Sequence, residues 1–304
     1  MEEKKKCRVC GCSDGDCRRC IERTGHPCHW AEDDLCSACK TIVVTFASIK
    51  GGVGRTNTVI LLAMCLAAAG IRVLLIDCDL NNSLSFHFIE KELLGKIKSL
   101  HIAAALSDEN NNLNDFVVPT IIKGVDIIAS TPYLADLRTL SEKRLKRMIP
   151  ALYGKYDILI VDCAPTYDNI VLNAVNAADI TITPVLKDLF SYNAASFLMG
   201  VLPRDVPNFK NWFLLINGYD DRFEDAKSGR QNDFLELYKG NFPLTPPETW
   251  LPWTNQIHLV IDYHKNLSRT KGIAGTVYNP SLHNAVAKLA GCFFQEELAV
   301  PEVF

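Results

Sequence analysis

Short apolar runs rich in β-branched residues recur along the chain from residue 41 to residue 216. Such runs are typical of strands buried on both faces of a parallel sheet, because neither face then needs a regular alternation of polar side chains. They predict six strands: Thr41–Ala47, Arg72–Ile76, Val125–Ala129, Asp157–Val161, Ile180–Pro184 and Trp212–Ile216.

Longer segments that mix apolar and polar positions lie between and after these runs. They predict helices over Thr56–Ala69, Tyr133–Met148, Asn169–Ala178, Phe190–Val201 and Leu282–Glu297. The Asn-rich segment 108–115 and the proline-rich segment 243–252 are predicted to be irregular. Because strands that alternate with helices imply βαβ crossovers, we expect an α/β fold with a doubly wound, mainly parallel sheet over residues 41–304.

The first 40 residues have a different pattern, with few apolar residues and many cysteines. Formal charge cancels here, since eight basic and eight acidic side chains are present. A segment of this composition can hardly form a core without metal. We therefore expect residues 1–40 to be a small metal-stapled unit, called the cysteine module below. DNA, a partner protein and the rest of the chain are all open as its contact.

Eight of the 12 cysteines lie in this module, and their spacing contains three C-x2-C pairs. Each pair can bring two thiolates to one tetrahedral ion, so eight thiolates suffice for two zinc ions. The candidate zinc ligands are Cys7, Cys10, Cys12, Cys17, Cys20, Cys28, Cys36 and Cys39. His26 and His29 are possible substitutes.

Two other interpretations of the cysteines stay open. The ferredoxin run C-x2-C-x2-C-x3-C-P is absent, which disfavours an iron–sulfur cluster. Disulfides would need an oxidising compartment. The later cysteines, Cys65, Cys78, Cys163 and Cys292, lie in apolar surroundings and are expected to be packing residues.

Overall charge and hydropathy exclude two classes of protein. The net charge is −3 and the pI is about 6.2, so the chain does not hold nucleic acid by bulk positive charge. It has no run of about 18 apolar residues, as a spanning helix would need. The charged N-terminus leads into cysteines rather than an apolar segment, unlike a signal peptide. We expect a cytoplasmic protein.

The most specific chemical signal is the segment Lys50-Gly-Gly-Val-Gly-Arg-Thr56, between the first predicted strand and the first predicted helix. A glycine loop in this position lets successive backbone N–H groups point at one anion near the positive end of a helix. The Thr56 hydroxyl is placed for Mg²⁺. Strand, turn and helix together are the context that a P-loop requires.

This segment resembles the deviant Walker A motif of the ParA/MinD superfamily, K-G-G-x-G-K-[ST]. Further segments are similar to the family's later motifs in the same order: Leu74–Asp79 to the second acidic motif, Tyr156–Pro165 to Walker B and its switch, 178–184 to the next strand and 278–281 to the segment before the last helix. The resemblance covers residues 41–297 and implies a P-loop NTPase fold.

The resemblance also implies roles for individual residues. Lys50 matches the signature lysine, which in the family reaches across an ATP-bound dimer to the other subunit's phosphates. Asp79 matches the acid that orients the attacking water, with Asp77 as its supporting neighbour. Thr56 and Asp162 match the residues that hold Mg²⁺. The remaining implied nucleotide contacts are Gly51, Gly52, Val53, Gly54, Arg55, Asn57 and, after the sixth strand, Asn217.

One position departs from the motif, since Arg55 replaces the usual P-loop lysine. Arginine carries a planar fork where lysine carries a compact charge, so ATP binding is expected to persist while hydrolysis becomes slow.

The resemblance implies a ParA-type ATPase that forms a homodimer on binding ATP and Mg²⁺, binds DNA nonspecifically and associates with the nucleoid. Its output would be segregation or positioning of a plasmid or mobile element, with a ParB-like partner. Arg269 and Lys271 lie where relatives carry DNA-contacting residues, whereas the basic cluster 143–147 is more simply a solvated helix face.

Three alternatives remain. One is a non-hydrolysing, ATP-switched module that binds DNA or protein through its cysteines. Another is a MinD-like positioning ATPase at a membrane, which the acidic, proline-containing tail 295–304 disfavours. The third is metal-cluster delivery, which the zinc-like spacing disfavours.

Overall fold

The computed structural model describes residues 5–95, 97, 99–137, 139–219, 229–252 and 280–294. Its centre is an eight-stranded sheet with the order β10-β9-β8-β3-β7-β4-β6-β5. The strands are β3 (Ile42–Phe46), β4 (Val73–Cys78), β5 (Val118–Pro119), β6 (Val125–Ile128), β7 (Ile158–Cys163), β8 (Ile180–Val185), β9 (Trp212–Tyr219) and β10 (Leu251–Pro252). The pairs are parallel except for β5 against β6. The predicted α/β fold with a mainly parallel sheet is confirmed.

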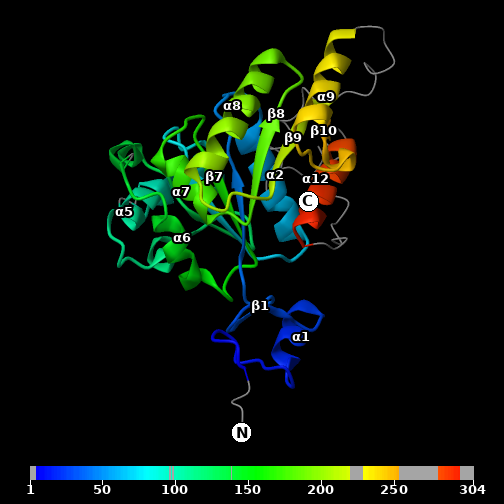
Figure 1. The fold of residues 1–304 in the computed structure, drawn as a ribbon. Coiled ribbons are helices and arrows are strands. Elements are labelled where there is room, and N and C mark those ends of the chain that lie inside the picture. The colour runs from blue at the N-terminus through cyan, green and yellow to red at the C-terminus, as the bar shows by residue number, and fades with distance from the viewer. Residues whose placement is uncertain are drawn as a thin grey trace, which may run out of the picture.

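Helices cover both faces of the sheet (Figure 1). One face is packed by α2 (Arg55–Ala68), α3 (Ser83–Phe88) and α12 (Pro280–Phe294). The other face is packed by α5 (Ile102–Ser107), α6 (Arg144–Met148), α7 (Asn169–Ala177), α8 (Leu189–Asp205) and α9 (Gly229–Asn241). Shorter elements complete this body: α4 (Lys91–Leu94), η1 (Leu113–Phe116), η2 (Pro132–Leu137), η3 (Ile149–Leu152) and η5 (Pro247–Thr249).

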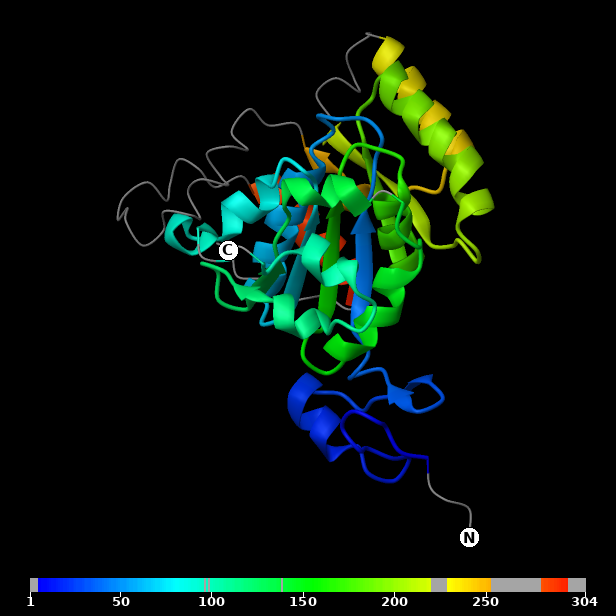
Figure 2. The same ribbon diagram turned by 90° about the vertical axis from the view of Figure 1, so that its left-hand side faces the viewer.

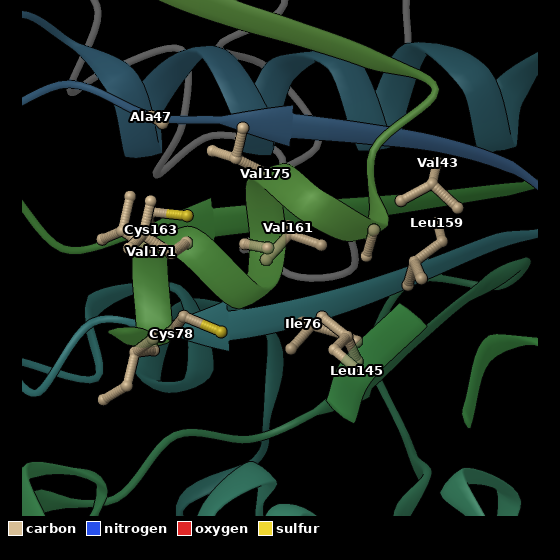
Figure 3. Close-up of a cluster of buried hydrophobic side chains, with 14 of the residues drawn as sticks. Val43, Ala47, Ile76, Cys78, Leu145, Leu159, Val161, Cys163, Val171 and Val175 are labelled. Carbon is tan, nitrogen blue, oxygen red and sulfur yellow. The ribbon is translucent and has the colours of Figure 1, made fainter. Parts of the chain in front are cut away.

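The strands of the sheet form the centre of the core, between the two layers of helices. Strands β4 and β7 are buried at every position, which is why their sequences are apolar runs without alternation. Figure 3 shows the sulfur atoms of Cys78 and Cys163 among aliphatic side chains of the core. These two and Cys65 are buried packing residues, as predicted, but the prediction for Cys292 is wrong. That side chain is exposed, because α12 turns Leu289 and Phe293 inward instead.

The prediction of one helix over Tyr133–Met148 is also wrong. The segment forms η2 and α6 with a break between them. Side chains of α7 satisfy the backbone at this break: Asn169 donates to the carbonyl of Leu140 (3.1 Å) and Asn173 to that of Ser141 (2.8 Å). These bonds replace the hydrogen bonds that a continuous helix would have made. The proline-rich segment 243–252, predicted to be irregular, contains η5 and the edge strand β10.

The cysteine module contains helix α1 (Arg18–Thr24) and a hairpin of β1 (Trp30–Glu32) and β2 (Leu35–Cys36). It lies beyond the end of the sheet where the parallel strands begin, and β3 runs away from it (Figure 2). We call residues 41–304 the sheet body. Among the described helices, none combines the length and apolar character needed to cross a membrane.

Candidate functional site

The glycine loop lies between β3 and α2, as the sequence predicts. Gly52 and Gly54 have positive φ angles of 74° and 80°, which favour glycine. At Gly54 a Cβ atom would also lie 2.2 Å from Nδ2 of Asn217. At Gly51 and Gly52 no atom lies within 4 Å of the place that a Cβ would take, and both are exposed. The loop therefore leaves open space in front of its own backbone.

Asn217 fixes the shape of this loop. Its Nδ2 donates a hydrogen bond to the carbonyl of Val53 over 2.7 Å. Val53 is buried and Asn57 is half-buried in the first turn of α2. The structure thus brings Asn217 to the loop, where it makes an intramolecular hydrogen bond that the sequence did not predict.

The acidic end of β7 lies directly beside the start of α2. The Thr56 hydroxyl donates to Oδ2 of Asp162 over 2.7 Å. Asp162 is fully buried, and burial raises the pKa of its carboxyl group, although Arg55 and Thr56 act in the opposite direction. A hydroxyl paired with a carboxylate beside a phosphate-binding loop is a donor set that suits Mg²⁺.

Arg55 is turned away from the open side of the loop and onto the carboxylates. Its Nε donates to Oδ1 of Asp162 over 2.8 Å, and its Nη2 donates to Oδ2 of Asp79 over 3.3 Å. The Arg55 side chain is only 7% exposed. Two acids and one arginine therefore form a buried cluster next to Thr56.

The two acids at the end of β4, Asp77 within the strand and Asp79 just after it, have different surroundings. Asp77 accepts hydrogen bonds from the backbone N–H and hydroxyl of Ser85 (2.9 and 2.7 Å), which tie it to α3. Burial, followed by the charge of Asp162, raises the pKa of Asp77 to about 7. Asp79 instead faces Arg55 and also accepts from Asn81. The structure places Asp79 in the cluster and gives Asp77 a bracing position behind it.

Lys50 is held within its own chain by groups that the sequence analysis missed. Its Nζ lies 2.7 Å from a carboxylate oxygen of Asp188 and 2.9 Å from the hydroxyl of Ser191. Asp188 also caps α8 by accepting from the Ser191 N–H. Burial raises the pKa of Asp188, but Lys50 and the cap outweigh it, and the net pKa is lowered. An aspartate at the start of a helix after a strand was the available signal.

The sulfur atoms of the cysteine module lie close together. Those of Cys10, Cys20 and Cys36 are separated by 3.7, 3.7 and 3.8 Å. Sulfurs bound tetrahedrally at about 2.3 Å from one ion are about 3.8 Å apart, so these three sulfurs are packed as closely as zinc ligands are. Two groups of four cysteines each have all their sulfur atoms within 4.8 Å of one another. The first group is Cys7, Cys10, Cys12 and Cys36, and the second is Cys12, Cys20, Cys28 and Cys36. His26 and His29 are exposed and belong to neither group.

The predicted basic surfaces receive no new support. Arg144 donates to the carbonyls of Leu106 and Ser107 (2.7 and 3.1 Å), so it fastens α6 to its neighbour. Arg269, Lys271 and the tail 295–304 lie outside the described residues.

Comparison with known proteins shows the family of the chain. Residues 40–204 match the family described as an AAA domain. The chain is 31% identical over 207 residues to the sporulation initiation inhibitor protein Soj of Bacillus subtilis, covering 66% of this chain and 79% of that protein. It is 30% identical over 190 residues to the chromosome partitioning protein ParA of Myxococcus xanthus, covering 59% of this chain and 66% of that one.

Among solved structures, a protein described as a plasmid partition protein of Borrelia burgdorferi, bound to AMPPNP, has a similar fold. The TM-score is 0.67 at 24% identity, covering 84% of this chain and 99% of the other. The family match begins at residue 40, after the last cysteine of the module. The glycine loop, the acids at the ends of β4 and β7 and these matches agree: the chain belongs to the ParA/MinD superfamily of P-loop ATPases.

Proposed function

We propose that the chain is an ATP-dependent, dimerising partition ATPase that binds DNA nonspecifically and segregates or positions a plasmid or mobile element. The observation that carries this proposal is the Thr56–Asp162 hydrogen bond beside an open glycine loop. The loop supplies backbone N–H donors for phosphate, and Thr56 and Asp162 supply oxygen ligands for Mg²⁺ beside it. The similarity to the chromosome partitioning protein ParA supports a role in partition, for which we propose a nucleoid location and a ParB-like partner.

Within one chain the residues divide the work as follows. Gly51, Gly52 and the first turn of α2 bind the phosphates of ATP. Thr56 and Asp162 would hold Mg²⁺, which would neutralise charge that develops on the phosphates during transfer to water. Asp79, which accepts a hydrogen bond from Arg55, would orient the attacking water.

Lys50 supplies the link to a second copy. In the family this lysine reaches the other subunit's phosphates, and here Asp188 and Ser191 hold it. Dimerisation therefore requires that Lys50 exchange these partners for phosphate. A partly exposed pair of this kind contributes about 1 kcal/mol or less, so ATP can displace it.

Arg55 makes turnover slow. Its guanidinium occupies Asp162 and Asp79, the two carboxylates that the metal and the water need. The planar guanidinium of Arg55 forms two directed hydrogen bonds here, whereas a lysine ammonium would attract the same carboxylates only as a compact charge. Each cycle must therefore break a buried ion pair before the site is complete.

Turnover of Mg-ATP by the wild-type chain and by Arg55→Lys tests this. We expect the variant to hydrolyse ATP several-fold faster and to need less Mg²⁺ for half-maximal rate. The matched control is Arg72→Lys, which alters the Arg72–Asp157 pair (2.6 Å) at the opposite end of the sheet. A variant that is no faster, with unchanged Mg²⁺ dependence, would show that Arg55 does not limit turnover.

A second candidate is an ATP-switched binding module that does not hydrolyse, and the buried Arg55 cluster is the observation that favours it. The two candidates differ in whether phosphate is released. DNA retention should require ATP in both cases and should weaken steeply with salt. Salt-insensitive binding to liposomes would instead favour the MinD-like alternative.

The cysteine module is proposed to bind two zinc ions and to be a separate unit at residues 1–40. The 3.7–3.8 Å sulfur triangle supports zinc. Metal analysis of the intact chain should find about two zinc ions. Iron with sulfide would favour cluster delivery.

A further inference from the structure

The eight cysteines could share two ions in more than one way. The two close groups overlap at Cys12 and Cys36 and omit Cys17 and Cys39. If each group bound one ion, the sulfurs of Cys12 and Cys36 would bridge both ions. Such a cluster would divide the pair Cys17–Cys20 and the pair Cys36–Cys39, because one member of each would bind no metal.

The neighbours of the two omitted cysteines identify a different division. The Cys39 thiol interacts with Cys10 and Cys36, and then with Cys7. The Cys17 sulfur lies 2.9 Å from that of Cys28 and interacts first with Cys28, then with Cys20 and last with Cys10. The strongest contacts of these two cysteines are therefore with different sets.

Two backbone hydrogen bonds to sulfur follow the same division, whereas the one between the Cys12 backbone and the Cys10 thiol crosses it. The N–H of Cys36 donates to the sulfur of Cys7 (3.5 Å), and the N–H of Cys28 donates to the sulfur of Cys17 (3.1 Å). Each of these two bonds stays within one set of neighbours. Tight turns also hold the C-x2-C pairs together, as in the 3.0 Å bond from the Cys39 N–H to the Cys36 carbonyl.

We infer that the module holds two zinc ions in two sites that share no ligand. The sites are nested in the sequence, since the cysteines of one lie between the two pairs of the other. The outer site is Cys7, Cys10, Cys36 and Cys39, and the inner site is Cys12, Cys17, Cys20 and Cys28. This rests on the proposed zinc binding. All three C-x2-C pairs stay intact, and the contacts of Cys20 with Cys10 and Cys36 are those of neighbouring sites that touch.

Charge supports the outer site. Four thiolates around one Zn²⁺ leave a net charge of −2, and Arg23 Nη2 lies 3.8 Å from the Cys39 sulfur. Arg19 donates to the carbonyl of Cys10, another outer ligand (3.1 Å). Both arginines belong to α1, which is attached to the inner site through Cys20. Helix α1 thus connects the two sites.

The outer site also joins the module to the sheet body. The Cys39 carbonyl accepts from the Gly154 N–H over 2.8 Å, and Lys40 forms an ion pair with Asp179 over 2.9 Å. The Arg8 guanidinium lies 5.6 Å from the ring centre of Tyr153, which packs against the cysteines. Only two residues separate Cys39 from β3. The inner site has no such contact among those described here.

Zinc content of intact chains carrying two paired substitutions tests the division. In nested sites, Cys36→Ser with Cys39→Ser removes only the outer ion, and Cys12→Ser with Cys17→Ser removes only the inner one. Each variant should retain about one zinc per chain after dialysis against a chelator. In a shared-sulfur cluster each pair contains a bridging ligand, so either variant would lose both ions. Cys292→Ser, at an exposed position in α12, is the control and should retain two.

A measurement on the wild-type chain covers the case in which a variant does not fold. Exchange of zinc for ¹¹³Cd should give two NMR signals without scalar coupling between the metals, because no sulfur bridges them. Coupling between the two signals would overturn the nested division. A wild-type chain without zinc would instead contradict the proposed zinc binding itself, which is a separate failure.

Discussion

The cysteine module and the sheet body become stable by different means. Strands β3, β4 and β7 of the body bury apolar side chains on both faces against two layers of helices. In the described part of the module, Leu35 is the only buried apolar side chain that is not cysteine. Apolar burial contributes about 25 cal/mol per Å², and the module has too little apolar surface to fold by it. The body therefore depends on packing, whereas the module depends on metal in the proposal made above.

Metal removal should separate the two regions most strongly. Structural zinc contributes on the order of 10 kcal/mol or more to folding of small domains, so chelation should unfold the module and leave the sheet intact. Hydrogen exchange should show loss of amide protection in residues 5–40 and retained protection in β3, β4 and β7. Protection of residues 5–40 that survives complete metal removal would contradict this account.

A substitution in the loop should have the next largest effect, and it should be confined to the body. In Gly54→Ala the new Cβ would meet Asn217 at 2.2 Å with φ at 80°, so the loop must deform. We expect ATP affinity to fall at least tenfold, with zinc content unchanged, as measured by calorimetric titration and metal analysis. The matched control is Gly200→Ala in α8, where nothing lies within 4 Å. Unchanged affinity in Gly54→Ala would show that this loop does not bind the nucleotide.

Release of Lys50 should have a smaller effect. Asp188→Asn keeps a side chain that can cap α8 but removes the charge that holds Lys50. Because partly exposed ion pairs contribute about 1 kcal/mol or less, the ATP-dependent dimerisation constant should rise by at most about fivefold for each of the two Lys50 side chains released. Light scattering measures this, with Asp205→Asn at the other end of α8 as control. A fall in dimer fraction would mean that Asp188 acts in the dimer rather than against it.

A further expected effect is a pH dependence that belongs to the body. Burial disfavours the charged form of Asp77 and raises its pKa from the ordinary 3.8 to about 7 in the fold. A raised carboxyl pKa stabilises the fold fully below the unfolded pKa, and this stability is lost as pH rises towards 7. Thermal melts between pH 4 and 7 should show a slope that is smaller in Asp77→Asn. An identical slope in both proteins would assign the pH dependence to other groups.

The sequence predicts the central strands well and the edges poorly. Strands β4 and β7 are apolar up to the aspartate near their ends because helices cover both faces, and that pattern is visible without a structure. Strands β5 and β10 have two residues each, too few for any periodicity. The break before α6 depends on Asn169 and Asn173, which lie close to the break in space but far from it in the sequence.

The same limit applies to the site. The loop and Asp162 follow from motif and context, since acids at the carboxyl ends of parallel strands converge. The pairing of Arg55 with Asp79 and Asp162, and of Lys50 with Asp188, arises from tertiary contacts that local sequence does not contain. Likewise, C-x2-C spacing predicts zinc but not which pairs share an ion.

The central claim is that the loop from Lys50 to Thr56 binds ATP with Mg²⁺ in the intact chain. Titration of Mg-ATP into the purified, metal-loaded protein tests it most directly. The account predicts saturable binding of one nucleotide per chain. Absence of binding at saturating Mg-ATP, in a chain shown to be folded and to retain its zinc, would contradict it.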